Sequence, residues 1–386
     1  MKIILTLCFF STAWAQSTKP TSSPVWDVEP VSQKRGLALD QAFAQLIKQH
    51  GINTACIGVI KAGQLVWQGQ YGQQNETESA SANTLINVAS ITKTVTAETV
   101  LRLVAQGKLD LDEPMAKYWV DPDLEGDAQV KQLTARMALS HRSGLPNWRF
   151  FTESGKLQFM NAPGSSFGYS GEGIVYVMRY AEKKLGKPFE DLVNEMVFEP
   201  LAIHNSFMRV IPENFPRIAK PLDDDGKFYG YYCYPGGYCR EAGSFSATGD
   251  MVTTVSDYAT FLVSAMRGDG LTESLKAERF KMNAVEVPKE QINCAGVANA
   301  RCPQRLGYGL GWCISVLDND LLIGHRGTDW STVSLAYCYQ NSGDGLIIFL
   351  NAPNRKGLAG MVAALELLDP DSPELHGYIM RRDRQN

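Results

Sequence analysis

The spacing of apolar residues in the first part of the chain predicts a helix, a hairpin and a longer second helix. Residues 38–49 carry apolar side chains at helical intervals. Apolar runs at 55–60 and 65–67 enclose a Lys-Ala-Gly-Gln turn, a pattern that is typical of a β-hairpin. A long helical pattern over 87–106 stops at Gly107, and glycine is favoured just beyond a helix end.

The middle of the chain combines short helical patterns with frequent Pro and Gly. Four helices are expected in it, near 131–140, 172–185, 189–198 and 256–267. Beyond Gly307 the pattern changes to apolar runs of strand length. Four strands are expected there, at 310–316, 321–324, 333–339 and 346–351. A final helix at 358–368 precedes a charged tail, which we expect to be loose.

Strands near both ends of the chain, with helices between them, predict an α+β fold with one sheet built from both ends. We expect a discontinuous sheet lobe from residues 16–108 and 305–386. Residues 109–304 would form an inserted, mainly helical lobe. A cleft between two lobes is a favoured place for a site, so we expect the active site there.

The first residues have the pattern of a signal peptide. Lys2 precedes an apolar run at 3–10, and Ala13-Trp14-Ala15 fits the small-x-small cleavage pattern. The run is shorter than the roughly 20 residues that a membrane span needs. We therefore expect cleavage after Ala15, which would make residues 1–15 the signal and the protein periplasmic or secreted. The alternative is an apolar N-terminal strand.

Composition excludes several classes of protein. The 386 residues are 44% hydrophobic, and the formal net charge is −4 at pH 7. That content is too apolar for a disordered chain, and the charge does not favour binding to nucleic acid through bulk positive charge. We expect a small-molecule or peptide substrate, with no nucleic acid and no membrane insertion after signal cleavage. The oligomeric state has no signature in the sequence.

The cysteines carry a second expectation, because an exported protein meets an oxidising compartment. Two pairs are close in sequence, and we expect a disulfide in each: Cys233–Cys239 and Cys294–Cys302. Three others lie in expected strands and would be buried thiols: Cys56, Cys313 and Cys338. No histidine stands at ligand spacing from these cysteines, so zinc is not expected.

Ser90 and Lys93 are the central candidates for chemistry. They open the helical stretch 87–106 as Ser-Ile-Thr-Lys, so their side chains would share one helical face. A serine hydroxyl becomes nucleophilic when a nearby base takes its proton, and a desolvated lysine can be that base. The motif is short, however, and a capping serine followed by a surface lysine gives the same pattern.

Five segments of the chain, in order, set this motif in a wider context: NVASITKTVTAETVLRLVAQGKLDLDEPMAKYW from Asn87, LTARMALSHRSGLP from Leu133, APGSSFGYSGEG from Ala162, AGSFSATGDMVTTVSDYATFL from Ala242, and GYGLGW with GHRG between Gly307 and Gly327. Together they resemble the serine β-lactamase-like and penicillin-binding-protein-like superfamily. That group holds class C β-lactamases, DD-peptidases, related esterases and D-amino-acid amidases, and the resemblance covers about residues 36–365.

The resemblance implies a β-lactamase/transpeptidase-like fold, with an antiparallel sheet flanked by helices and an inserted helical lobe. It implies that Ser90 is the acylated nucleophile and Lys93 its proton acceptor or relay. Tyr169 would be a second general base that also returns a proton to the leaving group. On the same basis no metal or organic cofactor is needed. His141 would brace its turn rather than take part in chemistry.

The resemblance also implies an oxyanion hole on an edge strand that faces Ser90. This strand would hold the substrate through His325 and Gly327, and the oxyanion would accept hydrogen bonds from the N–H groups of Ser90 and Thr328. Arg326 should point to the opposite side of the strand, because side chains alternate.

Two departures from the lactamase pattern affect the expected specificity. Tyr169-Ser170-Gly171 has glycine where a lactamase has the asparagine that touches the acyl side chain. His325-Arg326-Gly327 replaces Lys-Thr-Gly, and histidine is only partly charged near neutral pH. Tyr and Phe residues in the loop 227–240 could form a wall for an apolar acyl group, or could simply pack the loop.

The preferred function is therefore an exported serine hydrolase that acts through an acyl-enzyme on ester or amide bonds. D-Ala peptides, small esters and β-lactam-like compounds are its candidate substrates. One alternative is a class C-type β-lactamase proper, and another is a catalytically silent member that binds peptidoglycan or a partner. Gly164 to Gly168 also matches the G-x-S-x-G nucleophile elbow through Ser166, but no β-rich run precedes it.

Overall fold

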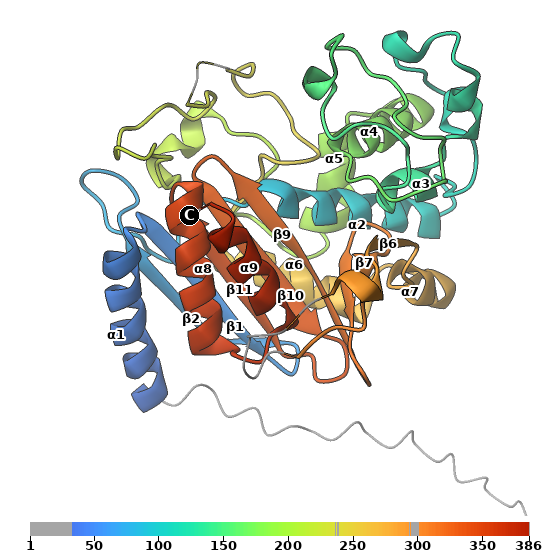
Figure 1. Cartoon of the computed structure of the whole chain (residues 1–386). Helices are drawn as coiled ribbons and strands as arrows, with labels where there is room; N and C mark the ends of the chain where they lie inside the picture. The colour runs from blue at the N-terminus through green and yellow to red at the C-terminus, as the bar shows by residue number, and fades with distance from the viewer. Residues whose placement is uncertain (1–32, 236, 238, 293, 295–300, 386) are drawn as a thin grey trace, which may run out of the picture.

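A computed structural model of the chain describes residues 33–385 except 236, 238, 293 and 295–300 (Figure 1). The expected signal peptide lies outside the described residues. No helix among the described residues is long and apolar enough to cross a membrane.

A large antiparallel sheet built from both ends of the chain forms the framework (Figure 1). Its strand order is β2-β1-β11-β10-β9-β8-β7-β6. The strands are β1 (Thr54–Lys61), β2 (Gln64–Gly72), β6 (Ala284–Val287), β7 (Arg305–Tyr308), β8 (Cys313–Val316), β9 (Leu321–Asp329), β10 (Thr332–Tyr339) and β11 (Gly345–Asn351). β1 pairs with β11, so the hairpin near the N-terminus and the C-terminal strands share one sheet, as the sequence predicted.

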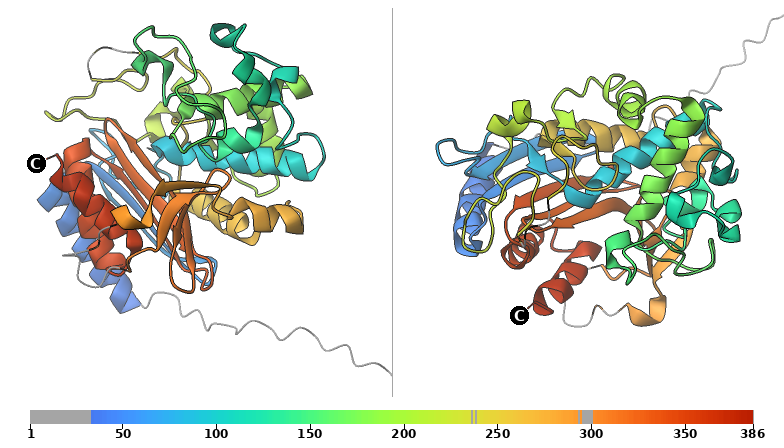
Figure 2. Two further views of the ribbon diagram at one scale, coloured as in Figure 1. Left: turned by 45° about the vertical axis from the view of Figure 1, so that its right-hand side comes forward. Right: turned by 90° about the horizontal axis from the view of Figure 1, so that it is seen from above.

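Helices cover both faces of this sheet (Figure 2). One face carries α1 (Gln33–His50), α8 (Asn354–Leu368) and α9 (Pro373–Asp383). The other face carries α2 (Thr92–Ala105) and α6 (Val255–Arg267). Beyond α2 lie α3 (Ala135–Leu139), α4 (Gly171–Leu185) and α5 (Phe189–Val193), whereas α7 (Glu273–Arg279) lies near β6 (Figure 1).

Alternation along β1 separates two hydrophobic cores. Ile57 packs with Phe43 of α1 in the core under α1, α8 and α9. Cys56 and Ile60 belong to the core shared with α2 and α6. Because successive side chains of a strand point to opposite faces, a strand covered on both sides is apolar at nearly every position. This explains the continuous apolar run that marks β1 in the sequence.

The assignment of residues 109–304 to a separate helical lobe was wrong for two elements. β6 (Ala284–Val287) pairs with β7 at the sheet edge, although it lies in the range 109–304 that we assigned to the helical lobe. α6 comes from the same range and packs on β1 and β2. The reason is that residues 255–287 hold short apolar patterns whose partner is decided by the sheet rather than by their neighbours in sequence.

The charged tail is a helix, α9, rather than a loose segment. Ser372 accepts a hydrogen bond from the N–H of Glu374 and so caps its first turn. Leu375 and Tyr378 are buried against the sheet. Tertiary burial of these two side chains stabilises a helix that its own highly charged sequence did not indicate.

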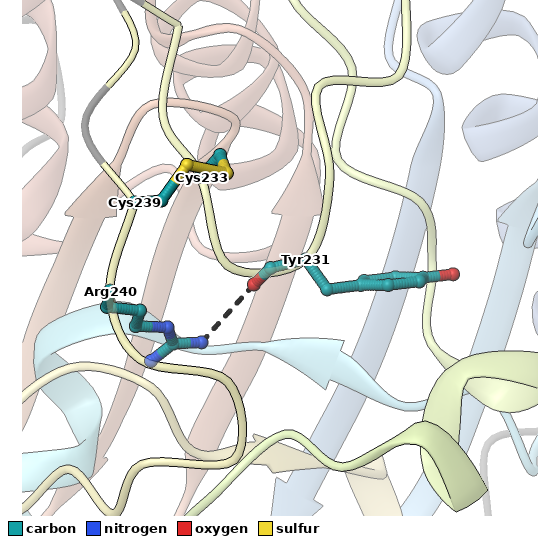
Figure 3. Close-up of a disulfide and its surroundings, with 4 residues drawn as sticks. All are labelled: Tyr231, Cys233, Cys239 and Arg240. Carbon is teal, nitrogen blue, oxygen red and sulfur yellow. Dashed lines mark hydrogen bonds between the residues drawn. A yellow bond between two sulfur atoms is a disulfide. The ribbon is translucent and has the colours of Figure 1, made fainter.

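Both expected disulfides form, Cys233–Cys239 and Cys294–Cys302. The three remaining cysteines of the described residues are buried free thiols, as expected: Cys56, Cys313 and Cys338. Figure 3 shows the Cys233–Cys239 bridge beside Arg240, whose guanidinium donates to the carbonyl of Tyr231 at 3.3 Å.

Candidate active site

A tight turn before α2 presents Ser90. We expected one helix from residue 87, but Asn87 ends the short strand β3 (Ile86–Asn87) and α2 begins only at Thr92. Ala89 has φ +47°, a left-handed conformation that prevents the helix from starting earlier. The Asn87 side-chain oxygen accepts from the N–H of Ala89 at 2.7 Å and holds this turn. Ser90 therefore stands in a 3₁₀ turn at the entrance to α2.

Lys93 is buried beside Ser90. Its Nζ donates to Ser90 Oγ at 3.0 Å and to the carbonyl of Thr248 at 2.8 Å, and the residue is 1% exposed. Burial lowers the pKa of this amine to about 7, although the nearby Asp250 carboxylate acts in the opposite direction. An amine with this pKa is largely neutral at slightly alkaline pH, which is the state that a general base needs.

Tyr169 and His141 complete the floor of the site. The Tyr169 ring centroid lies 5.2 Å from Lys93 Nζ. Burial raises the pKa of Tyr169 above its ordinary value, although an interaction with the Ser90 side chain acts to lower it, so the phenol stays protonated near neutral pH. His141 Nδ1 accepts from the N–H of Ser170 at 3.1 Å, and its ring lies 4.3 Å from the Tyr169 ring. His141 therefore positions the Tyr169 segment.

β9 passes directly beside the nucleophile turn. A Cβ atom added to Gly327 would lie 2.3 Å from the carbonyl oxygen of Val88 and 3.2 Å from Ala89 Cβ. β8 pairs with β9 only as far as Gly324, so the next residues of β9 have no β8 partner along that edge. This leaves the backbone near Thr328 open on the side where we expect the oxyanion hole.

His325 is a neutral acceptor in this arrangement. It is 2% exposed, and its Nδ1 lies 2.7 Å from the carbonyl oxygen of Arg326, which makes Nδ1 the protonated nitrogen. Its Nε2 has no hydrogen-bond partner among the described residues. Burial, with the charge of nearby Lys93, lowers its pKa to about 3. The position therefore carries no positive charge at neutral pH, less than the partial charge that the sequence suggested.

Arg326 points away from the site, as strand alternation predicted. Its guanidinium donates to both carboxylate oxygens of Glu374 on α9, at 2.6 and 3.2 Å. Glu374 is 4% exposed. The pair joins β9 to α9 on the far face of the sheet from Ser90, so it stabilises the strand without touching the reacting groups.

Arg326→Met should therefore lower stability but keep the chemistry. The change removes the charged hydrogen-bond donor of the buried Glu374 carboxylate. This loss should lower the free energy of unfolding by about 1–3 kcal/mol. Urea denaturation followed by circular dichroism gives that value, and kcat on an activated ester should stay within about twofold. A large fall in kcat with unchanged stability would contradict this placement of Arg326.

The aromatic loop 227–240 packs against neighbouring segments, which is one of the two roles left open by the sequence, and its role as a wall for an acyl group stays a prediction. Tyr231 stacks on Phe215 at 4.3 Å, and the Tyr232 hydroxyl donates to the carbonyl of Val210 at 3.0 Å, so these two rings pack the loop. Tyr229 and Tyr234 line a cavity of about 40 Å³ together with Tyr231 and Tyr232.

The same cavity holds a group of charged side chains missed by the sequence reasoning. Arg240 forms an ion pair with Asp250, and Asp329 lies close to both. Burial and the Asp250 charge raise the pKa of Asp329 to about 6. No motif marked these residues, because their meeting depends on the fold of the loop over the end of β9.

Trp148 was also missed, and it lies at the reacting centre. Its ring centroid is 5.9 Å from Lys93 Nζ. It lies two residues after Pro146, the last residue of the SGLP segment that carried the resemblance, and this nearness was the only available signal. Ser166 of the G-x-S-x-G match is exposed in a turn, with neither a strand before it nor a helix directly after it. No cluster of histidine, cysteine or acidic side chains among the described residues could hold a metal ion.

Comparison with known proteins gives a consistent result. The model of the beta-lactamase family matches residues 39–368. Penicillin-binding protein 4* of Bacillus subtilis (strain 168) is 23% identical over 337 residues, 80% of this chain and 70% of that protein. Esterase EstB of Burkholderia gladioli is 28% identical over 210 residues, 46% of this chain and 53% of the esterase.

Solved structures agree on the fold. The octameric penicillin-binding protein homologue from Pyrococcus abyssi has a TM-score of 0.68 at 21% identity, covering 90% of this chain and 80% of that one. A D-stereospecific amidohydrolase from Streptomyces sp. has a TM-score of 0.63 at 21% identity, covering 87% and 99%. The chain belongs to the beta-lactamase family and has its β-lactamase/transpeptidase-like α+β fold.

Proposed function

We propose that the protein is an exported serine hydrolase that cleaves ester or amide bonds through an acyl-enzyme on Ser90. The observation that carries the proposal is the buried Lys93 amine, 3.0 Å from Ser90 Oγ with a pKa of about 7. A structural lysine at a helix start would be exposed and charged, whereas this one is desolvated against a hydroxyl.

The acylation step follows from the positions of three side chains. Ser90 Oγ attacks the substrate carbonyl carbon while its proton passes to the neutral Lys93 amine. The oxyanion forms beside β9, where the N–H groups of Ser90 and Thr328 would stabilise it. The proton then moves through the Tyr169 phenol to the departing alkoxide or amine, which leaves as an alcohol or amine. An ester between Ser90 and the acyl group remains.

Deacylation uses the same groups in the opposite direction. A water molecule gives its proton to the neutral Lys93 amine as its oxygen attacks the acyl carbon, either directly or through the Tyr169 hydroxyl, which accepts that proton while passing its own to Lys93. Ser90 leaves and takes the proton back, and the carboxylic acid is released. No step needs a metal or an organic cofactor, because the nucleophile, the base and the oxyanion donors all belong to the chain.

The direct test is covalent labelling. A fluorophosphonate probe should attach to the peptide that contains Ser90, as located by mass spectrometry. Ser90→Ala should abolish the adduct, and Ser166→Ala, the matched control at the elbow-like motif, should keep it. Absence of any adduct on a folded protein would favour the catalytically silent, binding-only alternative.

A substrate panel would separate the enzyme alternatives. The neutral His325 and the glycine at 171 remove two groups that the resemblance associates with β-lactam recognition. We therefore expect cleavage of a p-nitrophenyl ester and slow or absent turnover of nitrocefin. Efficient nitrocefin hydrolysis would instead support a class C-type β-lactamase. Export is tested separately, by an intact mass that begins at Gln16 in the periplasmic or secreted fraction.

A further inference from the structure

Two exposed aromatic side chains reach the reacting centre through Trp148, outside the groups used above. Phe150 and Phe151 are 60% and 71% exposed. Phe150 stacks on Trp148 with ring centroids 6.0 Å apart and an interplanar angle of 8°. Phe151 meets Phe150 edge-on at 4.6 Å. Since the Trp148 ring is 5.9 Å from Lys93 Nζ, these rings form a continuous aromatic shelf from the nucleophile's base to solvent.

The inner end of the shelf occupies space that a side chain at position 171 would otherwise fill. A Cβ atom added to Gly171 would lie 2.8 Å from the Trp148 ring and 2.9 Å from the carbonyl oxygen of Asn147. The Gly171 N–H donates to that carbonyl at 3.1 Å, which fixes the close approach. The glycine in Tyr-Ser-Gly therefore makes room for an aromatic ring, so the cleft has an apolar wall where a polar side chain could have stood.

The residue directly before the two exposed rings, Arg149, is held by ion pairs. Arg149 donates to Glu172 Oε2 at 2.9 Å and to Asp121 Oδ2 at 2.8 Å. Both carboxylates are buried, and the hydrogen bond to Glu172, followed by that to Asp121 and the charges of both groups, raises the pKa of Arg149 above its ordinary value. These ion pairs fix the backbone directly before Phe150 and Phe151. The exposure of the two rings is therefore a feature of the fold and not the result of a frayed loop. Large apolar side chains clustered on a surface mark interaction sites.

We infer that this shelf, formed by Trp148, Phe150 and Phe151, binds an extended apolar chain of the substrate. The substrates would then be esters or amides with a medium-length alkyl or aryl chain on one side of the scissile bond. The inference rests on the proposed function, because it assigns an occupant to the same cleft. An extended apolar chain of the substrate fits this shelf, because the shelf begins at the reacting groups and is open at its outer end.

Two series of esters test the inference: p-nitrophenyl acetate, butanoate and octanoate for the acyl side, and ethyl, butyl and octyl acetate for the alcohol side. All are used below their critical micelle concentrations. We expect kcat/KM to rise about tenfold to a hundredfold with chain length in one series, since a fully buried methylene is worth roughly fourfold and a half-buried one less. Phe150→Ser/Phe151→Ser should remove most of that rise and leave the shortest ester unchanged.

A matched control is Leu367→Ser/Met380→Ser, which removes exposed apolar side chains from α8 and α9 on the opposite face of the sheet. This variant should keep the chain-length preference. Kd values of methylboronic and octylboronic acid from calorimetry give a readout without turnover: octylboronic acid should bind more tightly to the wild type, and the gain should vanish in the Phe variant.

The outcomes separate the two proposals. Labelling at Ser90 together with no chain-length preference in either series and equal boronic acid affinities would overturn the shelf and leave the hydrolase proposal standing. Failure to label Ser90 would overturn the hydrolase proposal, while tighter binding of octylboronic acid that depends on Phe150 and Phe151 would still support the shelf.

Discussion

Replacing Lys93 with methionine is expected to lower kcat/KM by about a thousandfold, within the range that general-base catalysis supplies. Methionine has a similar length and no amine, so the hydroxyl of Ser90 loses its proton acceptor while the packing is kept. The side chain is buried, and an apolar replacement should leave the melting temperature unchanged or higher. Lys108→Met, an exposed lysine just beyond the end of α2, is the control and should keep full activity.

The role of Lys93 as the base also predicts in which direction the activity changes with pH. Burial holds the pKa of Lys93 at about 7, so the neutral, proton-accepting amine is populated above that pH. Activity on an activated ester should therefore rise as the pH increases through about 7 and then level off. His325 does not titrate in this range because its pKa is lowered to about 3.

The residual activity of Lys93→Met should lack this step near pH 7. A wild-type profile that is flat between pH 5 and 9 would contradict the assignment of Lys93 as the base. A thousandfold loss of kcat/KM in Lys93→Met would also contradict the assignment if the near-ultraviolet circular dichroism spectrum collapsed, because unfolding would then explain the loss.

The sheet was the most predictable part of this fold. β1, β10 and β11 are covered on both faces, so each is a continuous apolar run in the sequence. Such a run can be recognised as a strand without knowing which strands it pairs with. β6 is four residues long and only partly buried, and its place at the sheet edge depends on pairing with β7. The local sequence pattern therefore could not predict that β6 is a strand of this sheet.

The residues of the site also divide into those that the sequence could predict and those that it could not. Ser90 and Lys93 are three positions apart in sequence, so any helical or 3₁₀ turn brings them together, even though α2 starts later than expected. Trp148 is near Lys93 only because Gly171 allows its ring to enter, and these positions are far apart in sequence. The charge state of His325 was also hidden, since burial rather than residue type decides it.

A methyl group at position 327 is expected to lower kcat by about a hundredfold, the effect that a displacement of about 1 Å can have on a reacting geometry. In Gly327→Ala the new Cβ would lie 2.2 Å from Ser334 Oγ and 2.3 Å from the carbonyl oxygen of Val88. Ser334 Oγ itself donates to that carbonyl at 2.7 Å, so it cannot turn away without breaking the contact between β10 and the nucleophile turn. β9 must therefore move away from Ser90.

This movement would separate the two proposed oxyanion donors, because one belongs to Ser90 and the other to Thr328, the residue after Gly327. The loss should appear in kcat more than in KM, since the donors act on charge that develops only in the transition state. Gly377→Ala in α9 is the control, because a Cβ there meets no atom within 4 Å and alanine favours a helix. If Gly327→Ala keeps its kcat while its melting temperature falls, the close approach of β9 serves stability alone and the oxyanion hole lies elsewhere.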